Sequence, residues 1–216
     1  MHDYQSAFLD FAIARGALLF GTFTLKSGRV SPYFFNSGKF DDGASIRELG
    51  RYYSEAVVRS DIRFDMVYGP AYKGIPLAVA AAIGLYEVQG INCPYAFNRK
   101  EKKLHGEGGT VVGHPLQGRV LVVDDVISAG TSVRESVDII RGAGAEIAGV
   151  AIALDRQERG LDGTSAIAEV ERTFGLKVVS IASLTTLIQH LSGKPEVKTH
   201  LENIRRYQAD YGILNP

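Results

Sequence analysis

RVLVVDDVISAGTS, residues 119–132, is the stretch from which the fold of this chain can be inferred. Residues 120–123 form an unbroken apolar run, which predicts a strand buried on both faces of a parallel sheet. The strand ends in two acids, Asp124 and Asp125, and a run of small residues follows at 128–132. The stretch is therefore expected to turn sharply at the edge of a sheet.

A helix is expected to begin close to Ser132. Val133, Val137 and Ile140 fall at helical spacing, and Ser132 with Glu135 has the pattern of a capping box. A strand, a small-residue turn and a helix N-terminus together form an anion site, because free backbone N–H groups and the helix dipole point into the turn.

Acids beside such a site do not bind phosphate, but they suit sugar hydroxyls or a metal ion. Gly130 would let a phosphate approach the backbone closely. The combination therefore fits a sugar phosphate, whereas either feature alone would fit an ordinary turn whose acids are solvated. The sequence VLVVDDVISAGTS resembles the phosphoribosyl-pyrophosphate (PRPP) motif of type I phosphoribosyltransferases, and other features described below resemble their orotate-specific members.

The resemblance implies that Asp124 and Asp125 hold the ribose hydroxyls and contact Mg²⁺ directly or, more readily, through those hydroxyls or water. Ser128 stands where the family commonly has threonine, so the hydroxyl is kept. Val126 and Ile127 are expected to contact the substrate, and the residues expected to surround the 5′-phosphate are Ser128, Ala129, Gly130, Thr131 and Ser132.

A second strand–turn–helix junction is expected at residues 64–84. A buried strand at 64–68 is broken by Gly69-Pro70, and the residues AYKG, 71–74, lead into a helix at 75–84. Lys73 could meet a pyrophosphate there, although alone it would be an ordinary charge at a helix start. The resemblance adds Tyr72 to the substrate site and predicts a cis peptide between Ala71 and Tyr72.

Residues 98–113 are interpreted as a mobile lid, because they are polar, cationic and rich in glycine. A solvated surface loop is the alternative. In the family resembled, this loop reaches into the active site of a neighbouring subunit, which implies a homodimer. The residues that match its orotate-type motif are Arg99, Lys100, Lys103 and His105.

The base is expected to bind beneath a small hood formed by residues 1–40. The pattern predicts a helix at 4–15 and strand-like segments at 18–25 and 33–36. Because neighbouring side chains in a strand point to opposite faces, at most one of Phe34 and Phe35 should belong to the core, leaving the other to stack on a flat ring.

Two cations are candidates for the carboxylate or carbonyl edge of the base. Lys26 precedes a Ser-Gly turn in the hood, and Arg156 follows a strand predicted at 147–154. The alternatives are a surface lysine and an ion pair of Arg156 with Asp155 or Glu158.

Alternating strands and helices predict an α/β fold, a twisted and mostly parallel sheet flanked by helices, with residues 1–216 as one domain. Another capping box, Ser45 to Glu48, predicts a helix start near Ser45. The remaining expected elements are helices at 164–174, 183–191 and 195–208 and a strand at 177–182.

The resemblance implies the reaction of orotate with PRPP, assisted by Mg²⁺, to give orotidine 5′-monophosphate and pyrophosphate in pyrimidine (UMP) biosynthesis. The residues expected to act in catalysis are Lys73, Lys100, Lys103, His105, Asp124 and Asp125. Three alternatives stay open: a transferase for a purine or uracil, a non-catalytic PRPP-binding regulator, and a phosphoacceptor receiver domain.

Composition excludes several other classes of protein. Lys+Arg and Asp+Glu are equal at 24 each, which gives no basic field for nucleic acid. The single cysteine, Cys93, is compatible with a reducing compartment. The N-terminus does not have the pattern of a secretion signal, and the longest apolar stretch, 74–86, is shorter than the roughly 20 residues that span a bilayer. We therefore expect a soluble, cytoplasmic protein.

Overall fold

The computed structural model describes residues 1–25, 27–103, 109–128, 130–160, 163–194 and 197–213, with backbone alone at 102, 103 and 109. A six-stranded sheet in the order β5-β4-β3-β6-β7-β8 forms its centre, and only β5 runs antiparallel to its neighbour. The strands of this sheet are β3 (Met66–Gly69), β4 (Tyr95–Lys103), β5 (Gly109–Gly113), β6 (Arg119–Asp124), β7 (Glu146–Asp155) and β8 (Val178–Ser183).

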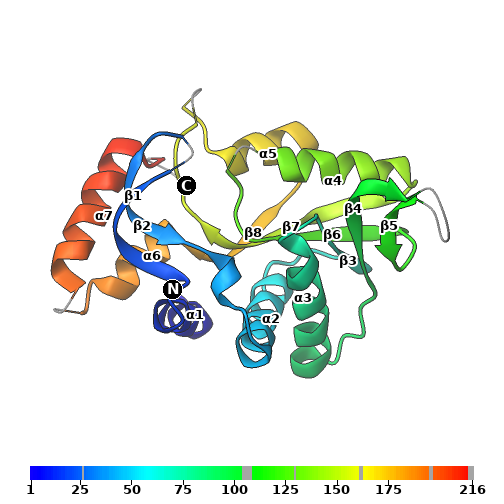
Figure 1. Ribbon diagram of the computed structural model, residues 1–216, viewed down its shortest axis with the longest axis horizontal. Helices are drawn as coiled ribbons and strands as arrows, with labels where there is room; N and C mark the ends of the chain where they lie inside the picture. The colour runs from blue at the N-terminus through cyan, green and yellow to red at the C-terminus, as the bar shows by residue number, and fades with distance from the viewer. Residues whose placement is uncertain (26, 104–108, 129, 161–162, 195–196, 214–216) are drawn as a thin grey trace.

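Helices cover both faces of this sheet, as Figure 1 shows. One face packs on α1 (Asp3–Ala14), α2 (Gly43–Val58) and α3 (Gly74–Gln89), and the other packs on α4 (Thr131–Gly142) and α5 (Ala166–Phe174). The period-two alternation of a strand divides β6 between the two cores: Leu121 and Val123 face the first, and Val120 and Val122 face the second. The predicted α/β architecture is confirmed.

The chain leaves the sheet centre in two directions. From β3 it continues to β4 and β5 on one side, and from β6 it continues to β7 and β8 on the other, so β3 and β6 are direct neighbours. Ligands of open parallel sheets bind where the strand order reverses in this way, at the carboxyl ends of the strands. This point brings together the two junctions that the sequence predicts.

A two-stranded antiparallel hairpin lies beside the main sheet, in the part of the chain where the hood is expected. It consists of β1 (Leu18–Thr24) and β2 (Val30–Phe35) and is followed by the short 3-10 helix η1 (Ser37–Lys39). Two C-terminal helices, α6 (Leu184–Leu191) and α7 (Lys198–Tyr211), complete this end of the molecule (Figure 1). Within the described ranges, no helix is long and apolar enough to cross a membrane.

Two glycines let α2 and α3 touch through their backbones. A Cβ atom on Gly50 would lie 2.1 Å from the carbonyl oxygen of Ala80, and one on Gly84 would lie 2.2 Å from the carbonyl oxygen of Gly50. Neither position has room for a side chain. This contact fixes α3, the helix that begins directly after Lys73.

Both predicted capping boxes are wrong in detail. The N-cap of α2 is Asp42, whose carboxylate accepts from the Ser45 amide at 2.7 Å, so the helix begins earlier than predicted. The N-cap of α4 is Gly130, in the left-handed region with φ +68°, and the Ser132 hydroxyl donates to Asp124 instead. Local spacing identified a residue that participates in the cap of α2 but assigned its role to the wrong position.

Candidate active site

The two predicted junctions meet at the carboxyl edge of the sheet. The Lys73 ammonium lies 2.9 Å from Oδ2 of Asp125, which joins the turn after β3 to the turn after β6. The peptide between Ala71 and Tyr72 is cis, as the resemblance predicts. The amide of Ala71 donates to Oδ1 of Asn98 at 2.8 Å, so β4 also holds this turn.

Asp124 is buried but keeps several hydrogen bonds. Its Oδ2 accepts from the Ser132 hydroxyl at 2.7 Å, and its Oδ1 accepts from the amide of Asp125 at 2.9 Å. Burial raises the pKa of Asp124 to about 6, and the hydrogen bond from Ser132 opposes that rise. The Tyr53 hydroxyl of α2 donates to the backbone carbonyl of Asp124 at 2.7 Å and fixes the end of β6 from below.

Asp125 gathers partners from separate segments. Its Oδ2 accepts from the Ser37 hydroxyl at 2.8 Å as well as from Lys73, and its Oδ1 accepts from the amide of Val126 at 2.9 Å. Ser37 and Tyr53 were not predicted. A serine in a Ser-Gly turn and a tyrosine on an apolar helix face carry no local signal of a contact so distant in sequence.

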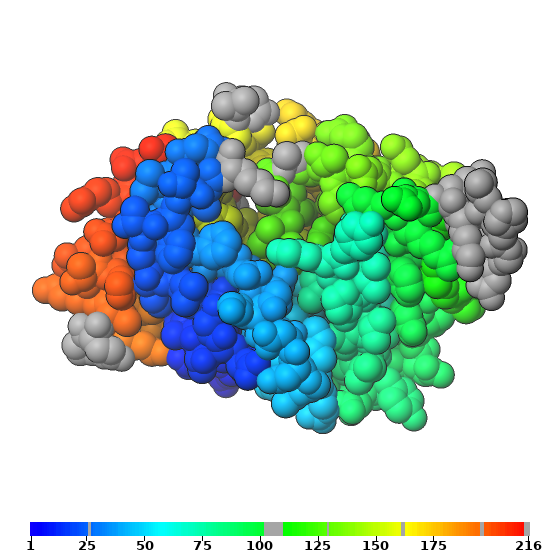
Figure 2. Space-filling view, viewed as in Figure 1, coloured from blue at the N-terminus to red at the C-terminus, as the bar shows by residue number. Residues whose placement is uncertain are grey.

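A cavity of about 260 Å³ opens beside Asp124, and neither Asp125 nor Lys73 is among the residues that line it. Figure 2 shows the molecule hollowed between the hood and the carboxyl edge of the sheet. The residues that line the cavity are Ala71, Lys100, Asp124, Val126, Ile127, Ser128, Gly130, Thr131, Ser132, Val133 and Glu135. Each described residue predicted for the phosphate turn is among them; Ala129 lies outside the described residues.

The arms of the expected lid are strands rather than loop. Residues 98–103 belong to β4 and residues 109–113 form β5, which pair as an antiparallel ribbon. Lys100 lies with Nζ 6.0 Å from the ring centre of exposed Tyr72, and Nη1 of Arg99 is buried with no hydrogen-bond partner among the described residues. His105 and the side chain of Lys103 lie outside the described residues.

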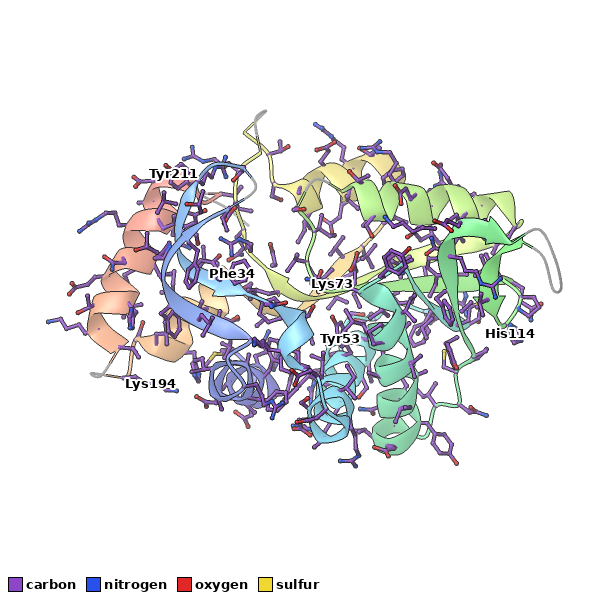
Figure 3. The ribbon with its side chains drawn as sticks, in the orientation of Figure 1. Phe34, Tyr53, Lys73, His114, Lys194 and Tyr211 are labelled. Atoms are coloured by element: carbon purple, nitrogen blue, oxygen red, sulfur yellow. The ribbon has the colours of Figure 1, made fainter. Side chains whose placement is uncertain are left out.

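The hood separates the roles of its two phenylalanines. Phe35 is a core residue, whereas Phe34 is 38% exposed and stacks on Phe23 with ring centres 5.5 Å apart. Figure 3 shows Phe34 on β2, across the hollow from Lys73. Phe34 is therefore the phenylalanine of this pair that stays outside the core, and Lys26 lies outside the described residues.

Arg156 stands directly after β7 and contacts the hood. Its Nη2 donates to the Ser31 hydroxyl at 3.0 Å, and its Nε donates to Oε1 of Glu158 at 2.7 Å. Burial works against its charge, but Tyr33 and Glu158 around it raise its pKa above the usual value. The predicted ion pair with Glu158 is thus present, and the hydrogen bond to Ser31 joins Arg156 to β2 of the hood.

Comparisons with known proteins agree with this geometry. Residues 39–182 match the family model described as a phosphoribosyl transferase domain. An orotate phosphoribosyltransferase of Thioalkalivibrio sulfidiphilus is 59% identical over 213 residues, covering 99% of this chain and 100% of that protein.

Two solved structures extend the likeness to the fold. The orotate phosphoribosyltransferase of Francisella tularensis has a TM-score of 0.86 at 38% identity and covers 95% of this chain and 99% of its own. The enzyme of Mycobacterium tuberculosis in complex with PRPP has a TM-score of 0.62 at 25% identity, covering 85% of this chain and 98% of its own.

Proposed function

This chain belongs to the phosphoribosyltransferase family and to its orotate-specific members, and from that premise we propose how its residues carry out the transfer. The reaction moves the 5-phosphoribosyl group from PRPP to orotate and yields orotidine 5′-monophosphate and pyrophosphate, a step of de novo pyrimidine biosynthesis. The observation that carries the assignment of residues is the 2.9 Å contact between Lys73 and Asp125, because it places a cation and an acid pair within reach of one small ligand.

The turn from Val126 to Ser132 receives the 5′-phosphate. It lines the cavity, and Gly130 begins α4 with backbone N–H groups directed at the turn. A Cβ at Gly130 would lie 3.2 Å from Val170 and would require a positive φ of a side-chain-bearing residue, so glycine is needed there. The phosphate charge is met by the helix dipole and by the hydroxyls of Thr131 and Ser132.

Asp124 and Asp125 accept hydrogen bonds from the ribose hydroxyls. Each carboxylate oxygen can accept more than one hydrogen bond, so the present partners Ser132, Ser37 and Lys73 leave capacity for a sugar. The raised pKa of Asp124, about 6, leaves this carboxyl largely ionised at neutral pH.

Lys73, Lys100, Lys103 and His105 stabilise the leaving pyrophosphate. The bond from C1 of the ribose to pyrophosphate breaks with oxocarbenium character, so negative charge accumulates on the leaving group while the ring nitrogen of orotate, already deprotonated, bonds to C1. Lys73 is 59% exposed and makes one carboxylate contact, which leaves other N–H donors for a phosphate oxygen. Removing one preorganised donor of this kind typically costs about 10²–10³ in rate.

Mg²⁺ fits this site as an ion carried largely by the substrate. Among the described residues there is no group of three or more His, Cys, Asp or Glu side chains that could hold a metal. Mg²⁺ commonly binds through one or two carboxylates together with phosphates and water, and Asp124 and Asp125 supply such a pair. When bound, it would neutralise charge on the pyrophosphate.

The base stacks on Phe34 while Lys26 and Arg156 meet its polar edges. Phe34 is the exposed phenylalanine of the hood, and Arg156 contacts the same hairpin through the Ser31 hydroxyl. A planar guanidinium suits the carbonyl or carboxylate edge of a flat heterocycle. The wild-type enzyme is tested by mixing it with orotate, PRPP and Mg²⁺ and following the loss of orotate absorbance; adenine, hypoxanthine and uracil serve as competing bases.

We further propose a homodimer whose lid, residues 98–113, closes over the neighbouring active site. Large apolar side chains are exposed on α3 and just after it, including Tyr86 at 62%, Ile83 at 46% and Ile91 at 40%, and such a face suits a second copy. The lone cysteine, Cys93, is buried and free, which is compatible with the cytoplasm.

Complementation tests the shared site. Mixing Lys103→Ala chains with Asp125→Ala chains should restore activity, because a mixed dimer contains one active site with neither substitution. Activity that stays at the level of either variant after the chains have exchanged would contradict lid sharing.

A further inference from the structure

The guanidinium of Arg156 is held on three sides. Oε1 of Glu158 accepts from Nε at 2.7 Å and lies 2.5 Å from Nη2, and Nη2 also donates to the Ser31 hydroxyl at 3.0 Å. The ring of Tyr33 lies beneath the guanidinium, with Cζ 4.2 Å from the ring centre. These contacts fix both the plane of the guanidinium and the direction in which it points.

Glu158 is itself held in place from α7. The Tyr207 hydroxyl donates to Oε1 of Glu158 at 2.9 Å, and Arg29 approaches Oε2 at 3.8 Å. The ring of Tyr207 meets that of Tyr33 edge-on, with centres 6.2 Å apart and planes at 86°. Tyr207 is therefore a buried support that contacts both the carboxylate and the ring beneath Arg156.

This arrangement leaves one corner of Arg156 for a ligand. Nε and Nη2 are used by Glu158 and Ser31, whereas Nη1, with two N–H groups, has no hydrogen-bond partner among the described residues. The side chain of Arg156 is 16% exposed, and Nη1 is not completely buried. The pairing with Glu158 offsets the charge of Arg156, which makes Nη1 an oriented donor more than a free cation.

We propose that Glu158 and Tyr207 are positioning residues that hold Arg156 so that Nη1 donates to a carbonyl oxygen of the pyrimidine ring. This inference rests on the proposed role of Arg156 in binding orotate.

A stabilising role alone does not account for the pair. The side chains of Arg156 and Glu158 are 16% and 17% exposed, and an ion pair so buried loses much of its attraction to the cost of desolvation. Apolar side chains of similar volume would hold the hood to the sheet at least as well. An oriented donor, in contrast, requires a fixed acceptor behind it.

Steady-state kinetics with orotate and PRPP test the proposal. We expect Glu158→Ala to raise the KM for orotate about tenfold and Tyr207→Phe to raise it about threefold, since one charged and one neutral hydrogen bond are removed. The KM for PRPP and kcat should stay within twofold. Glu158→Gln, which keeps an oxygen acceptor, should recover most of the loss.

Two matched variants control for general effects. Glu202→Ala removes an exposed carboxylate from α7, and Tyr211→Phe removes a hydroxyl from the tyrosine that packs beside Tyr207. Neither contacts Arg156 through a described hydrogen bond, so both should keep the wild-type KM for orotate.

A double-mutant comparison separates positioning from general stability. In an Arg156→Ala background, Glu158→Ala should change kcat/KM for orotate by less than twofold, because the group it positions is gone. A full further tenfold loss there, or an unchanged KM in both single variants, would overturn the proposal. If the circular dichroism spectrum shows that Glu158→Ala is unfolded, the KM for orotate of Tyr207→Phe alone tests the proposal. Wild-type protein that does not consume orotate would refute the proposed function instead.

Discussion

Strands β3 and β6 are joined by an ion pair at each end, and the two pairs differ in what they leave open. At the amino end, Arg119 forms a fork on Asp65, with Nε at 3.0 Å and Nη2 at 2.7 Å. At the carboxyl end, Lys73 makes one contact to Asp125 at 2.9 Å. The first pair uses two N–H donors of the arginine on one carboxylate, whereas the second uses one ammonium contact and leaves other N–H groups of Lys73 free.

Burial reinforces this difference. The side chains of Asp65 and Arg119 are 47% and 43% exposed, so water competes with their contact, while Asp125 is only 10% exposed and its neighbours Asp124 and Val126 line a cavity. Ion pairs at opposite ends of the same two strands thus form an exposed structural contact at one end and the proposed substrate site at the other. In open parallel sheets, ligands bind at the carboxyl ends of the strands and not at the amino ends.

The largest expected effect comes from removing the cation at each end. Lys73→Met should lower kcat by about 10²–10³, because it removes a preorganised donor to the leaving group. Arg119→Met, its counterpart at the amino end, should leave kcat within twofold. Both are measured by loss of orotate absorbance under saturating substrates.

An equal loss of kcat in Lys73→Met and Arg119→Met would contradict the proposed difference between the two ends of the strands. Melting temperatures of the two proteins, measured without substrate, establish that any loss in Lys73→Met does not come from unfolding.

Asp124→Asn should lower kcat/KM for PRPP about 10–100-fold, since a charged acceptor for a ribose hydroxyl becomes neutral. It should also stabilise the free enzyme. The pKa of Asp124 is raised to about 6 by burial, so the folded protein binds more protons than the unfolded chain between about pH 4 and pH 6, and wild-type stability falls as the pH rises through that window.

Asp124→Asn has no ionisable group at this position, so its folding stability does not fall as the pH rises. Thermal unfolding at pH 8 should therefore favour Asp124→Asn by up to about 3 kcal/mol, and the advantage should disappear at pH 4. An advantage that does not change with pH would show that burial of the charge is not its cause.

Ser37→Ala should have a smaller effect on activity, lowering kcat/KM about 2–10-fold, because Asp125 loses one neutral hydrogen-bond donor but keeps Lys73. Ser37→Thr keeps the hydroxyl and should restore activity. No rescue by threonine, together with an altered melting temperature, would indicate a packing role for Ser37.

The smallest effect is expected at the amino end. Arg119 lowers the pKa of Asp65 to about 2, so the pair stabilises the fold above the unfolded pKa near 4 and loses that contribution as the pH falls toward 2. Arg119→Met should lower the melting temperature by no more than a few degrees at pH 7, because exposed pairs contribute little. The difference from wild type should vanish near pH 2.

The sequence predicted the parts of this molecule that depend on neighbours along the chain. The buried run of β6, the turn at 126–132 and Lys73 before α3 follow from local spacing, and the cis peptide after Ala71 followed from the family resemblance. These features are set by apolar periodicity, glycine and short turns, which a window of a few residues contains.

The missed contacts depend on which strands are neighbours. Nothing local tells that β3 pairs with β6, and without that order Ser37 and Tyr53 cannot be assigned to the acids they contact. The capping roles given to Ser45 and Ser132 were wrong for a related reason: a serine hydroxyl has several acceptors in reach, and the surrounding fold selects one.

The backbone contact between α2 and α3 at Gly50 and Gly84 has a consequence for natural variation in this enzyme. Gly50 and Gly84 accept no substitute, because a Cβ atom at either position would lie about 2 Å from a carbonyl oxygen of the neighbouring helix. In a saturation library selected for growth without uracil, no substitution at these two positions should survive, although both lie well outside the substrate pocket. Inactivating substitutions at Gly50 or Gly84 would act by displacing the helix that follows Lys73, with every substrate-binding residue intact.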